Sequence, residues 1–220
     1  MMILQKAPNR CQRVLFFANQ TIDGSTYHGQ FSGMRYNGRG KFSFPSGDVY
    51  EGDFVQGEMC GFGEFQYTDG RMFSGSWLKN ERTGEGSLNY ASGEVFSGVY
   101  KDGIREGPGH FTQKDGTSIA GTWVADVLTG DVELKFNSGN TYTGGWKDNQ
   151  QNGQGKLTFS NGSTYTGEWV SGAQDGKGVY QDADGDNYDG EWKGGVQTGM
   201  GTLTRANGDV YVGHFLDSLK

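Results

Sequence analysis

The stretch QDADGDNYDGEW holds five carboxylates in twelve residues, and three of them alternate as in a calcium-binding loop. Asp182, Asp184 and Asp186 have the spacing of the first three ligands of a helix-loop-helix calcium site. Such a site also needs a turn glycine directly after the third aspartate and a glutamate at the twelfth position of the loop. Asn187 and Lys193 occupy those two places. We therefore predict no metal site in this stretch, and the sequence implies no cofactor.

Residues that could support catalysis are scattered along the chain. His28, His110 and His214 are its three histidines, and the repeat described below does not bring them together. Gly153 and Lys156 lie in a segment that superficially resembles a phosphate-binding loop, but the pattern G-x-x-x-x-G-K-[ST] is absent. Phosphate loops also open a helix, and the sequence predicts none. We therefore predict no catalytic residue and no enzymatic activity.

The composition indicates an ordered, glycine-rich protein. Glycine accounts for 40 of 220 residues and aromatic residues for 14%, a combination that excludes collagen and argues against disorder. The net charge is −7 and no Lys/Arg cluster stands out, which argues against nucleic acid and disfavours membrane lipid as the main partner. Cys11 and Cys60 are too few for a disulfide framework, and no apolar run has the length of a signal-peptide core. We expect a cytoplasmic protein.

The elements that must position all these residues come from one repeated pattern, aromatic-x-Gly-x-aromatic, which recurs every 23 residues. Eight full repeats and a half repeat, 211–220, make up an array over 27–220. Residues 1–26 form an N-terminal segment that is too short for a catalytic domain, and its residues 1–22 are either a targeting segment or a cap. Gly24 falls where a preceding repeat would place its second turn, so we expect a partial capping repeat there. The full repeats begin at residues 27, 50, 73, 96, 119, 142, 165 and 188.

Each repeat contains two stretches in which large apolar residues alternate with mostly polar ones, the pattern of two half-buried β-strands. We number every repeat from position 0 at its first aromatic residue. Positions 0, 4 and 15 are large and apolar, positions 2, 11 and 20 are glycine in all complete repeats, and position 13 is glycine except for Val132. We expect the rings at positions 0, 4 and 15 to pack within the sheet. The tryptophans of this structural column are Trp77, Trp123, Trp146, Trp169 and Trp192.

Glycine also marks the connections. The triplet PSG and its equivalents at positions 18–20 predict a type I turn closed by a left-handed glycine, and Asp184-Gly185 belongs to one of these turns. Residues such as Asn80 at position 7 tolerate the positive φ of a tight turn. Keeping the apolar residues on one face requires position 0 to face 15, position 2 to face 13 and position 4 to face 11. We expect the sheet to crease along its glycine rows, with rings at position 4 covering the glycines at position 11.

We therefore predict an all-β fold, an elongated single-layer antiparallel β-meander built from tandem 23-residue β-hairpin repeats. The pattern Y-x-G-x-W, its paired glycines and its period resemble the MORN (membrane occupation and recognition nexus) repeat over residues 27–220. The common Lys-x-His-Gly-x-Gly segment of that repeat is present here only through its glycines, so no role of its histidine carries over. The resemblance implies a concave aromatic groove that holds a helix or peptide of another protein. It also implies scaffold roles in cytoskeletal assemblies, including cilia and flagella.

Position 17 is the predicted lip of this groove. It is aromatic in five repeats and polar in three, whereas a purely structural demand would be uniform. Because charged residues replace the rings in repeats seven and eight, we expect a partner with apolar anchors toward repeats five and six and charged groups toward the last two. The predicted partner-binding residues are Phe44, Tyr67, Tyr90, Phe136, Phe159, Asp182 and Arg205.

These patterns favour a non-catalytic protein–protein interaction scaffold, associated with the cytoskeleton or with a cilium or flagellum. Two alternatives stay open. The first is peripheral membrane attachment through phosphoinositides, which the family resemblance implies and the net charge disfavours. The second is end-to-end assembly or a homodimer through a terminal edge strand, because the stretch 211–220 has no proline or charge run that would block strand pairing.

Overall fold

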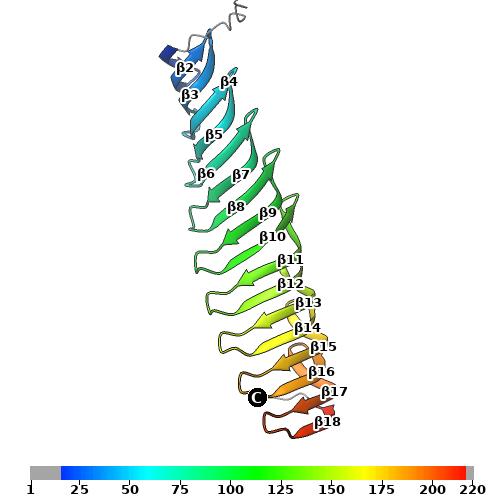
Figure 1. Ribbon diagram of the computed structural model, residues 1–220. Helices are drawn as coiled ribbons and strands as arrows, with labels where there is room; N and C mark the ends of the chain where they lie inside the picture. Colours follow the sequence, from blue (N-terminus) through cyan, green and yellow to red (C-terminus); the bar gives the residue numbers. More distant parts are fainter. Residues whose placement is uncertain (1–15, 217–220) are drawn as a thin grey trace, which may run out of the picture. The chain divides into compact units, whose positions relative to one another are not determined.

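A computed structural model describes residues 16–216 of the chain, and all the regular secondary structure in that range is β-strand (Figure 1). The chain divides into two compact units, residues 1–82 and 83–220, and each is described by itself. In both, consecutive strands are joined by short turns and pair antiparallel in sequence order. The prediction of an all-β antiparallel meander of hairpins is therefore confirmed.

The first unit begins with β1, which pairs with β2 and places Gln20 opposite Tyr27. The part of the predicted N-terminal segment before Phe16, including Cys11, lies outside the described residues. From β2 onward, each repeat contributes one hairpin. The strands of this unit are β1 (Phe16–Ile22), β2 (Ser25–Ser32), β3 (Arg35–Ser43), β4 (Val49–Val55), β5 (Glu58–Gln66) and β6 (Met72–Leu78).

The second unit continues the same alternation of a seven-residue and a nine-residue strand. Figure 1 shows its hairpins side by side in sequence order. Residues 217–220 of the terminal half repeat lie outside the described range. Its strands are β7 (Glu81–Asn89, beginning just before the unit), β8 (Val95–Lys101), β9 (Ile104–Thr112), β10 (Ser118–Val124), β11 (Val127–Lys135), β12 (Thr141–Lys147), β13 (Gln150–Thr158), β14 (Thr164–Val170), β15 (Ala173–Gln181), β16 (Asn187–Lys193), β17 (Val196–Thr204) and β18 (Val210–Phe215).

Between one repeat and the next, positions 11, 13 and 15 face positions 4, 2 and 0 of the following repeat, as Gly38 faces Phe54. Within a repeat, however, only two of the three predicted pairings are correct. Positions 0 and 2 face 15 and 13, but Phe31 at position 4 faces Tyr36 at position 9 instead of Gly38 at position 11. A bulge in the second strand causes this shift, because every glycine at position 11 has a positive φ, between 58° and 119°. Glycine is needed there for its backbone conformation.

Both kinds of connection have the predicted chemistry. In the first three-residue loop, the N–H of Phe44 donates to the carbonyl of Asp48, and the N–H of Gly47 donates back to the carbonyl of Phe44, each at 2.9 Å. The glycine at position 20 has a positive φ in every repeat. The other connection is a two-residue turn. In repeats two to eight both of its residues have a positive φ, for example 50° at Lys79 and 70° at Asn80, as in a type I′ hairpin.

In every repeat except the fifth, the sequence places an aromatic ring at position 0 and glycines at positions 2 and 13, and repeat seven shows the ring lying across these paired glycines. A Cβ atom added to Gly167 or Gly178 would come within 2.7 Å or 2.4 Å of the Tyr165 hydroxyl oxygen, so only glycine fits beneath this ring. The ring of Tyr165 also meets Trp169 and Trp192 edge to face, at centroid distances of 5.4 and 5.0 Å. Residues at position 0 thus link the position-4 rings of two successive repeats.

The predicted covering of the position-11 glycines by rings at position 4 is wrong. A Cβ atom added to Gly61 or Gly176 would meet the carboxylates of Asp53 or Glu168, which come from position 3. The bulge turns the position-11 glycine toward that side chain. In the seventh repeat, Glu168 uses this proximity to accept a hydrogen bond of 3.0 Å from the main-chain N–H of Lys177.

Candidate functional site: the aromatic face

The three alternating aspartates lie in the loop between β15 and β16, where their oxygens already accept hydrogen bonds. The N–H of Asp184 donates to Asp182 Oδ1 at 2.9 Å, and the Tyr180 hydroxyl donates to Asp182 Oδ2 at 3.3 Å. Asp186 Oδ1 accepts from the N–H of Ala206 and its Oδ2 from Arg205 Nη1, both at 2.9 Å. These bonds close the turn and tie it to the next loop. Across residues 16–216, no three His, Cys, Asp or Glu side chains form a group that could hold a metal ion.

The loop-to-loop bond of Asp186 recurs at position 21 of other repeats. Asp48 Oδ1 accepts from the N–H of Thr68 at 2.8 Å, and this bond is the main cause that lowers the pKa of the Asp48 carboxyl, followed by a bond to the Ser46 hydroxyl. Asn140 accepts in the same way from the N–H of Ser160, at 2.9 Å. Sequence reasoning missed these bonds, although recurrent Asp, Asn, Ser or Thr at position 21 was a usable signal.

The tryptophans predicted as a structural column line the aromatic face, which we define as the face that carries positions 0, 4, 15 and 17. Trp77, Trp123, Trp169 and Trp192 are buried. In three of them the indole N–H donates to the carbonyl of the position-13 glycine in the preceding strand, with distances of 3.2 Å for Trp77, 3.3 Å for Trp169 and 3.0 Å for Trp192. Trp146 is only partly buried.

The tyrosine hydroxyls at position 0 of the same face act as hydrogen-bond donors. Those of Tyr27, Tyr142 and Tyr165 donate to the carbonyl three residues later, at 2.9, 2.9 and 3.0 Å. Burial is the main cause that raises the pKa of each of these three hydroxyls to about 12. They stay protonated at neutral pH, so their chemistry here is structural.

The aromatic residues at position 17 are half-buried, between the closed core and solvent. Phe44 packs on Phe42 and Phe65, at centroid distances of 4.7 and 5.4 Å, and Tyr67 packs on Phe65 at 4.5 Å. In the second unit, Tyr90, Phe136 and Phe159 hold the same place: Tyr90 lies 6.2 Å from Phe111, and Phe136 and Phe159 pack against the core. Each ring is thus held by neighbours on one side and open on the other.

The charged end of the position-17 row is tied to its surroundings. Asp182 accepts the bond from Tyr180, and Arg205 is paired with Asp186 at 2.9 Å. Arg205 itself is exposed, and Gln113 is the other exposed member of the row. The row therefore changes from half-buried rings in repeats five and six to a hydrogen-bonded aspartate and an ion-paired arginine in repeats seven and eight.

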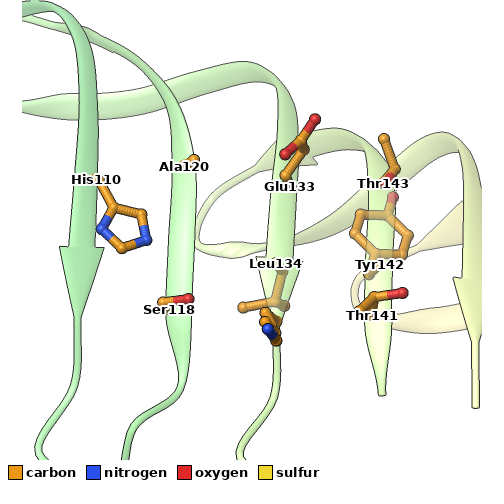
Figure 2. Close-up of a pocket in the computed structure, with 9 residues that line it drawn as sticks. His110, Ser118, Ala120, Glu133, Leu134, Thr141, Tyr142 and Thr143 are labelled. Atoms are coloured by element: carbon orange, nitrogen blue, oxygen red, sulfur yellow. The ribbon is translucent and has the colours of Figure 1, made fainter. Parts of the chain in front are cut away.

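A hollow in the second unit is lined mainly by residues of the face opposite the aromatic face (Figure 2). Its volume is about 350 Å³, and it spans β9 to β12. Ala120 on β10 stands opposite His110 on β9 and Glu133 on β11, so a small side chain separates two larger ones. His28 and His214 lie on other strands, so the structure does not bring the histidines together.

A comparison with known proteins bears on these features. The MORN repeat profile matches residues 27–49, 50–70, 73–95, 96–118, 142–164, 165–187 and 188–210. None of the curated proteins matches the chain in a sequence search. Within the described range, no helix is long and apolar enough to span a bilayer.

Solved structures with a similar fold include two domains from animals. One is the wild-type TCP10 domain of Danio rerio CPAP, at 12% identity over 90% of this chain and 88% of that chain, with a TM-score of 0.50. Another is the SAS-4 TCP domain of Drosophila melanogaster in complex with a proline rich motif of Ana2, at 13% identity over 96% of this chain and 97% of that chain, with a TM-score of 0.42. The likeness to the Danio rerio domain is one of fold alone, and the likeness to the Drosophila melanogaster domain carries no argument at its TM-score. The seven profile matches extend over residues 27–210, and the chain belongs to the MORN repeat family.

Proposed function

We propose that this protein is a non-catalytic scaffold whose aromatic face binds a helix or an extended peptide of a partner protein. The partner would insert a few apolar side chains between the half-buried rings of position 17. Those rings are already packed on one side, so little side-chain freedom would be lost on binding. Burial of a few such anchors supplies most of the affinity in helix-in-groove recognition.

The observation that supports this proposal best is the partial exposure of Phe136 and Phe159. Both rings pack against the core formed by residues such as Leu134 and Leu157, yet both keep a solvent-facing side. Neither ring is required to close the glycine rows, because Tyr142 covers the glycines of repeat six, and Leu128 and Val132 fill the corresponding space in repeat five. A large apolar ring that the sheet does not need for its own packing is available to a partner.

The change of chemistry along the row gives the proposed partner a direction. Phe136 and Phe159 would receive its apolar anchors, while Asp182 and Arg205 would face its polar or charged groups. Asp182 keeps an exposed part and Arg205 is exposed, so both can make further hydrogen bonds. Such bonds at a rim contribute more to orientation than to affinity.

Membership of the MORN family supports a scaffold role and, as a proposal, a cytoplasmic setting in a cytoskeletal or ciliary assembly. The non-catalytic part of the proposal is supported by the chemistry of the described residues. Their position-0 tyrosines are protonated donors to main-chain carbonyls. The clustered aspartates of the β15–β16 loop are engaged in turn hydrogen bonds.

A peptide selection tests the proposal. A phage library of natural protein segments would be selected against the full chain and, in parallel, against Phe136→Ser with Phe159→Ser. The matched control is Val124→Ser with Val170→Ser, which removes two exposed apolar side chains from the edge of the opposite face. We expect segments that are recovered by the wild type and the control and lost with the first variant. Equal recovery by all three proteins would contradict the proposal.

A further inference from the structure

Repeat five, residues 119–141, departs from the others at two linked positions. Ile119 replaces the ring at position 0, and Val132 replaces the glycine at position 13. The MORN profile matches the repeats on both sides, 96–118 and 142–164, and leaves this one unmatched. Both new side chains are buried, so the pair fills the space that a tyrosine ring over two glycines fills elsewhere. A Cβ atom added to Gly121 would lie 3.1 Å from Val132 Cγ1, which shows this filling directly.

The consequence appears one strand later, at Trp146. In repeats seven and eight, the position-4 indole donates to the glycine carbonyl of the preceding strand and meets the preceding position-0 ring edge to face. For example, the indole N–H of Trp169 donates to the carbonyl of Gly155 at 3.3 Å, and its ring lies edge to face with the Tyr142 ring at a centroid distance of 5.2 Å. For Trp146 the two corresponding residues are Val132 and Ile119. Within residues 16–216, its Nε1 donates to no acceptor although that atom is shielded from solvent, and no ring contact to it is formed.

Trp146 is therefore the partly exposed member of the tryptophan column. It packs against the core with one part of its ring and presents the rest to solvent. Gly144 and Gly145 precede it on β12 and Gly130 lies opposite it on β11, so among these preceding and paired neighbours only Gln151 on β13 carries a side chain. A shielded N–H without an acceptor costs free energy, and a partner that lets the ring turn and supplies a carbonyl recovers that cost.

The charge of the surrounding unit narrows the chemistry of the partner. Residues 83–220 contain 18 Asp and Glu against 10 Lys and Arg, whereas residues 1–82 contain 8 against 9. The acidic excess of the protein thus belongs to the unit that contains Trp146. Asp148 is exposed in the turn directly after β12, the strand of Trp146. Complementarity with this unit favours a positively charged segment.

We propose that Trp146 is the principal anchor point of the binding surface, and that the partner is a basic peptide segment whose apolar side chain packs on the indole ring. This inference rests on the proposed function, since it names the partner class and one contact residue of the same face. Ile119 and Val132 create the site, because Trp146 lacks both the glycine-carbonyl hydrogen bond and the edge-to-face ring contact that hold Trp77, Trp169 and Trp192 in place. Repeat five is then a specialised repeat, and its divergence has a binding role.

The test uses full-length protein labelled with 5-fluorotryptophan, whose five ¹⁹F resonances report on the five tryptophans separately. Trp146→Phe assigns the resonance of interest. The probes are two synthetic peptides with the same length and the same leucines, one with lysine and the other with glutamate at its polar positions. We expect the lysine peptide to bind and to shift the Trp146 resonance while the Trp169 resonance stays in place. The glutamate peptide should bind at least about tenfold more weakly.

A double variant keeps the test independent of folding. Ile119→Tyr with Val132→Gly restores the residues of the other repeats, so the sheet should stay intact and Trp146 should become buried. We expect its ¹⁹F resonance to lose its solvent isotope shift, and the lysine peptide to bind about tenfold or more weakly. The inference is overturned if the lysine peptide fails to bind the wild type, or if it binds the double variant and the wild type with equal affinity. It is also overturned if binding leaves the Trp146 resonance unmoved.

The inference can fail while the proposed function stands. Segments selected on the full chain that depend on Phe136 and Phe159, but that are acidic or leave Trp146 unmoved, would refute the inference alone. Selected segments that shift Trp146 and bind the Phe136→Ser/Phe159→Ser variant as tightly as the wild type would refute the position-17 site and keep the Trp146 anchor.

Discussion

The indole N–H of Trp192 donates a hydrogen bond of 3.0 Å to the main-chain carbonyl of Gly178, one strand away. The ring reaches this carbonyl because position 178 has no side chain and because the Tyr165 ring lies across the same glycine. Tryptophan, glycine and tyrosine at positions 4, 13 and 0 therefore act as one packing unit. A change at one of the three positions must be matched at another.

Transplanting the repeat-five pair tests this coupling. Gly178→Val alone should lower the free energy of unfolding by about 2–3 kcal/mol, because its Cβ would lie 2.4 Å from the Tyr165 hydroxyl oxygen. Adding Tyr165→Ile should recover a large part of that loss, since Ile119 and Val132 already coexist in repeat five. Urea denaturation of the two single variants and the double variant gives the coupling energy. Additive effects of the two substitutions would refute the packing unit.

The buried tyrosines predict a loss of stability at alkaline pH. Burial raises the pKa of Tyr142 and Tyr165 to about 12, whereas an unfolded chain titrates near 10. Between these values the unfolded state binds fewer protons than the folded state, so the free energy of unfolding falls as pH rises from about 10 to about 12. Below about pH 10 the stabilising contribution is fully present.

Chemical denaturation across this pH range, followed by tyrosinate absorbance, measures the slope. Tyr142→Phe should reduce the slope by about one proton. The fold accepts a phenylalanine ring at position 0, because Phe73 and Phe96 occupy that position in repeats three and four and are buried. A slope unaffected by Tyr142→Phe would show that this hydroxyl does not contribute.

The aspartate-rich loop should respond to substitution and remain indifferent to calcium. Asp186→Ala removes the acceptor of the Ala206 N–H and the ion-pair partner of Arg205, so we expect a loss of about 1–2 kcal/mol in the free energy of unfolding. Neither calcium nor a chelator should change the melting temperature of the wild type. A rise of the melting temperature with calcium concentration would contradict the reading of this loop as a turn.

The tight turns predict a stabilising substitution. Ala125 at position 6 of repeat five has a φ of 49°, a conformation that costs an alanine free energy and a glycine almost none. We expect Ala125→Gly to raise the free energy of unfolding by about 0.5–1 kcal/mol. Ala206→Gly is the matched control, because Ala206 is also exposed and lies outside the positive-φ residues, so it should be neutral or destabilising.

Several features of the fold were predictable because independent sequence signals indicate the same structure. The 23-residue period, the alternation around positions 0–4 and the glycine at position 20 each predict the same hairpins. The structure confirms the strands and both turn types at these places. Agreement between pattern and turn chemistry leaves little room for another register on the loop side of each repeat.

The bulge could not be predicted in the same way. A glycine at position 11 is expected if a neighbouring ring covers the strand at that point, and it is equally expected if the backbone there has a positive φ. The sequence alone does not distinguish these two explanations. The structure places Gly38 at φ 92° and shifts Phe31 onto Tyr36. The same ambiguity hid the role of position 3, whose side chain accepts a main-chain bond at the bulge in the first and seventh repeats.

For the candidate site, the sequence pattern predicts which residues share one face of the sheet, but it does not predict how exposed each of them is. Period 2 assigns Phe136 and Phe159 to the same face as Trp146 and Trp169. The exposure of each ring depends on the side chains that contact it from the preceding repeat. The repeat pattern does not distinguish these side chains from one repeat to another. Trp146 was grouped with the structural column, and its difference from Trp169 arises from side chains at positions 119 and 132.

The most direct measurement of the proposed binding face is calorimetric titration of one selected peptide into three proteins under identical conditions. These are the wild type, Phe136→Ser with Phe159→Ser, and the opposite-face control Val124→Ser with Val170→Ser, each with its β-sheet circular dichroism checked first. The proposal predicts that binding is lost, or weakened at least about a hundredfold, in the first variant only. An unchanged affinity in that variant would contradict it.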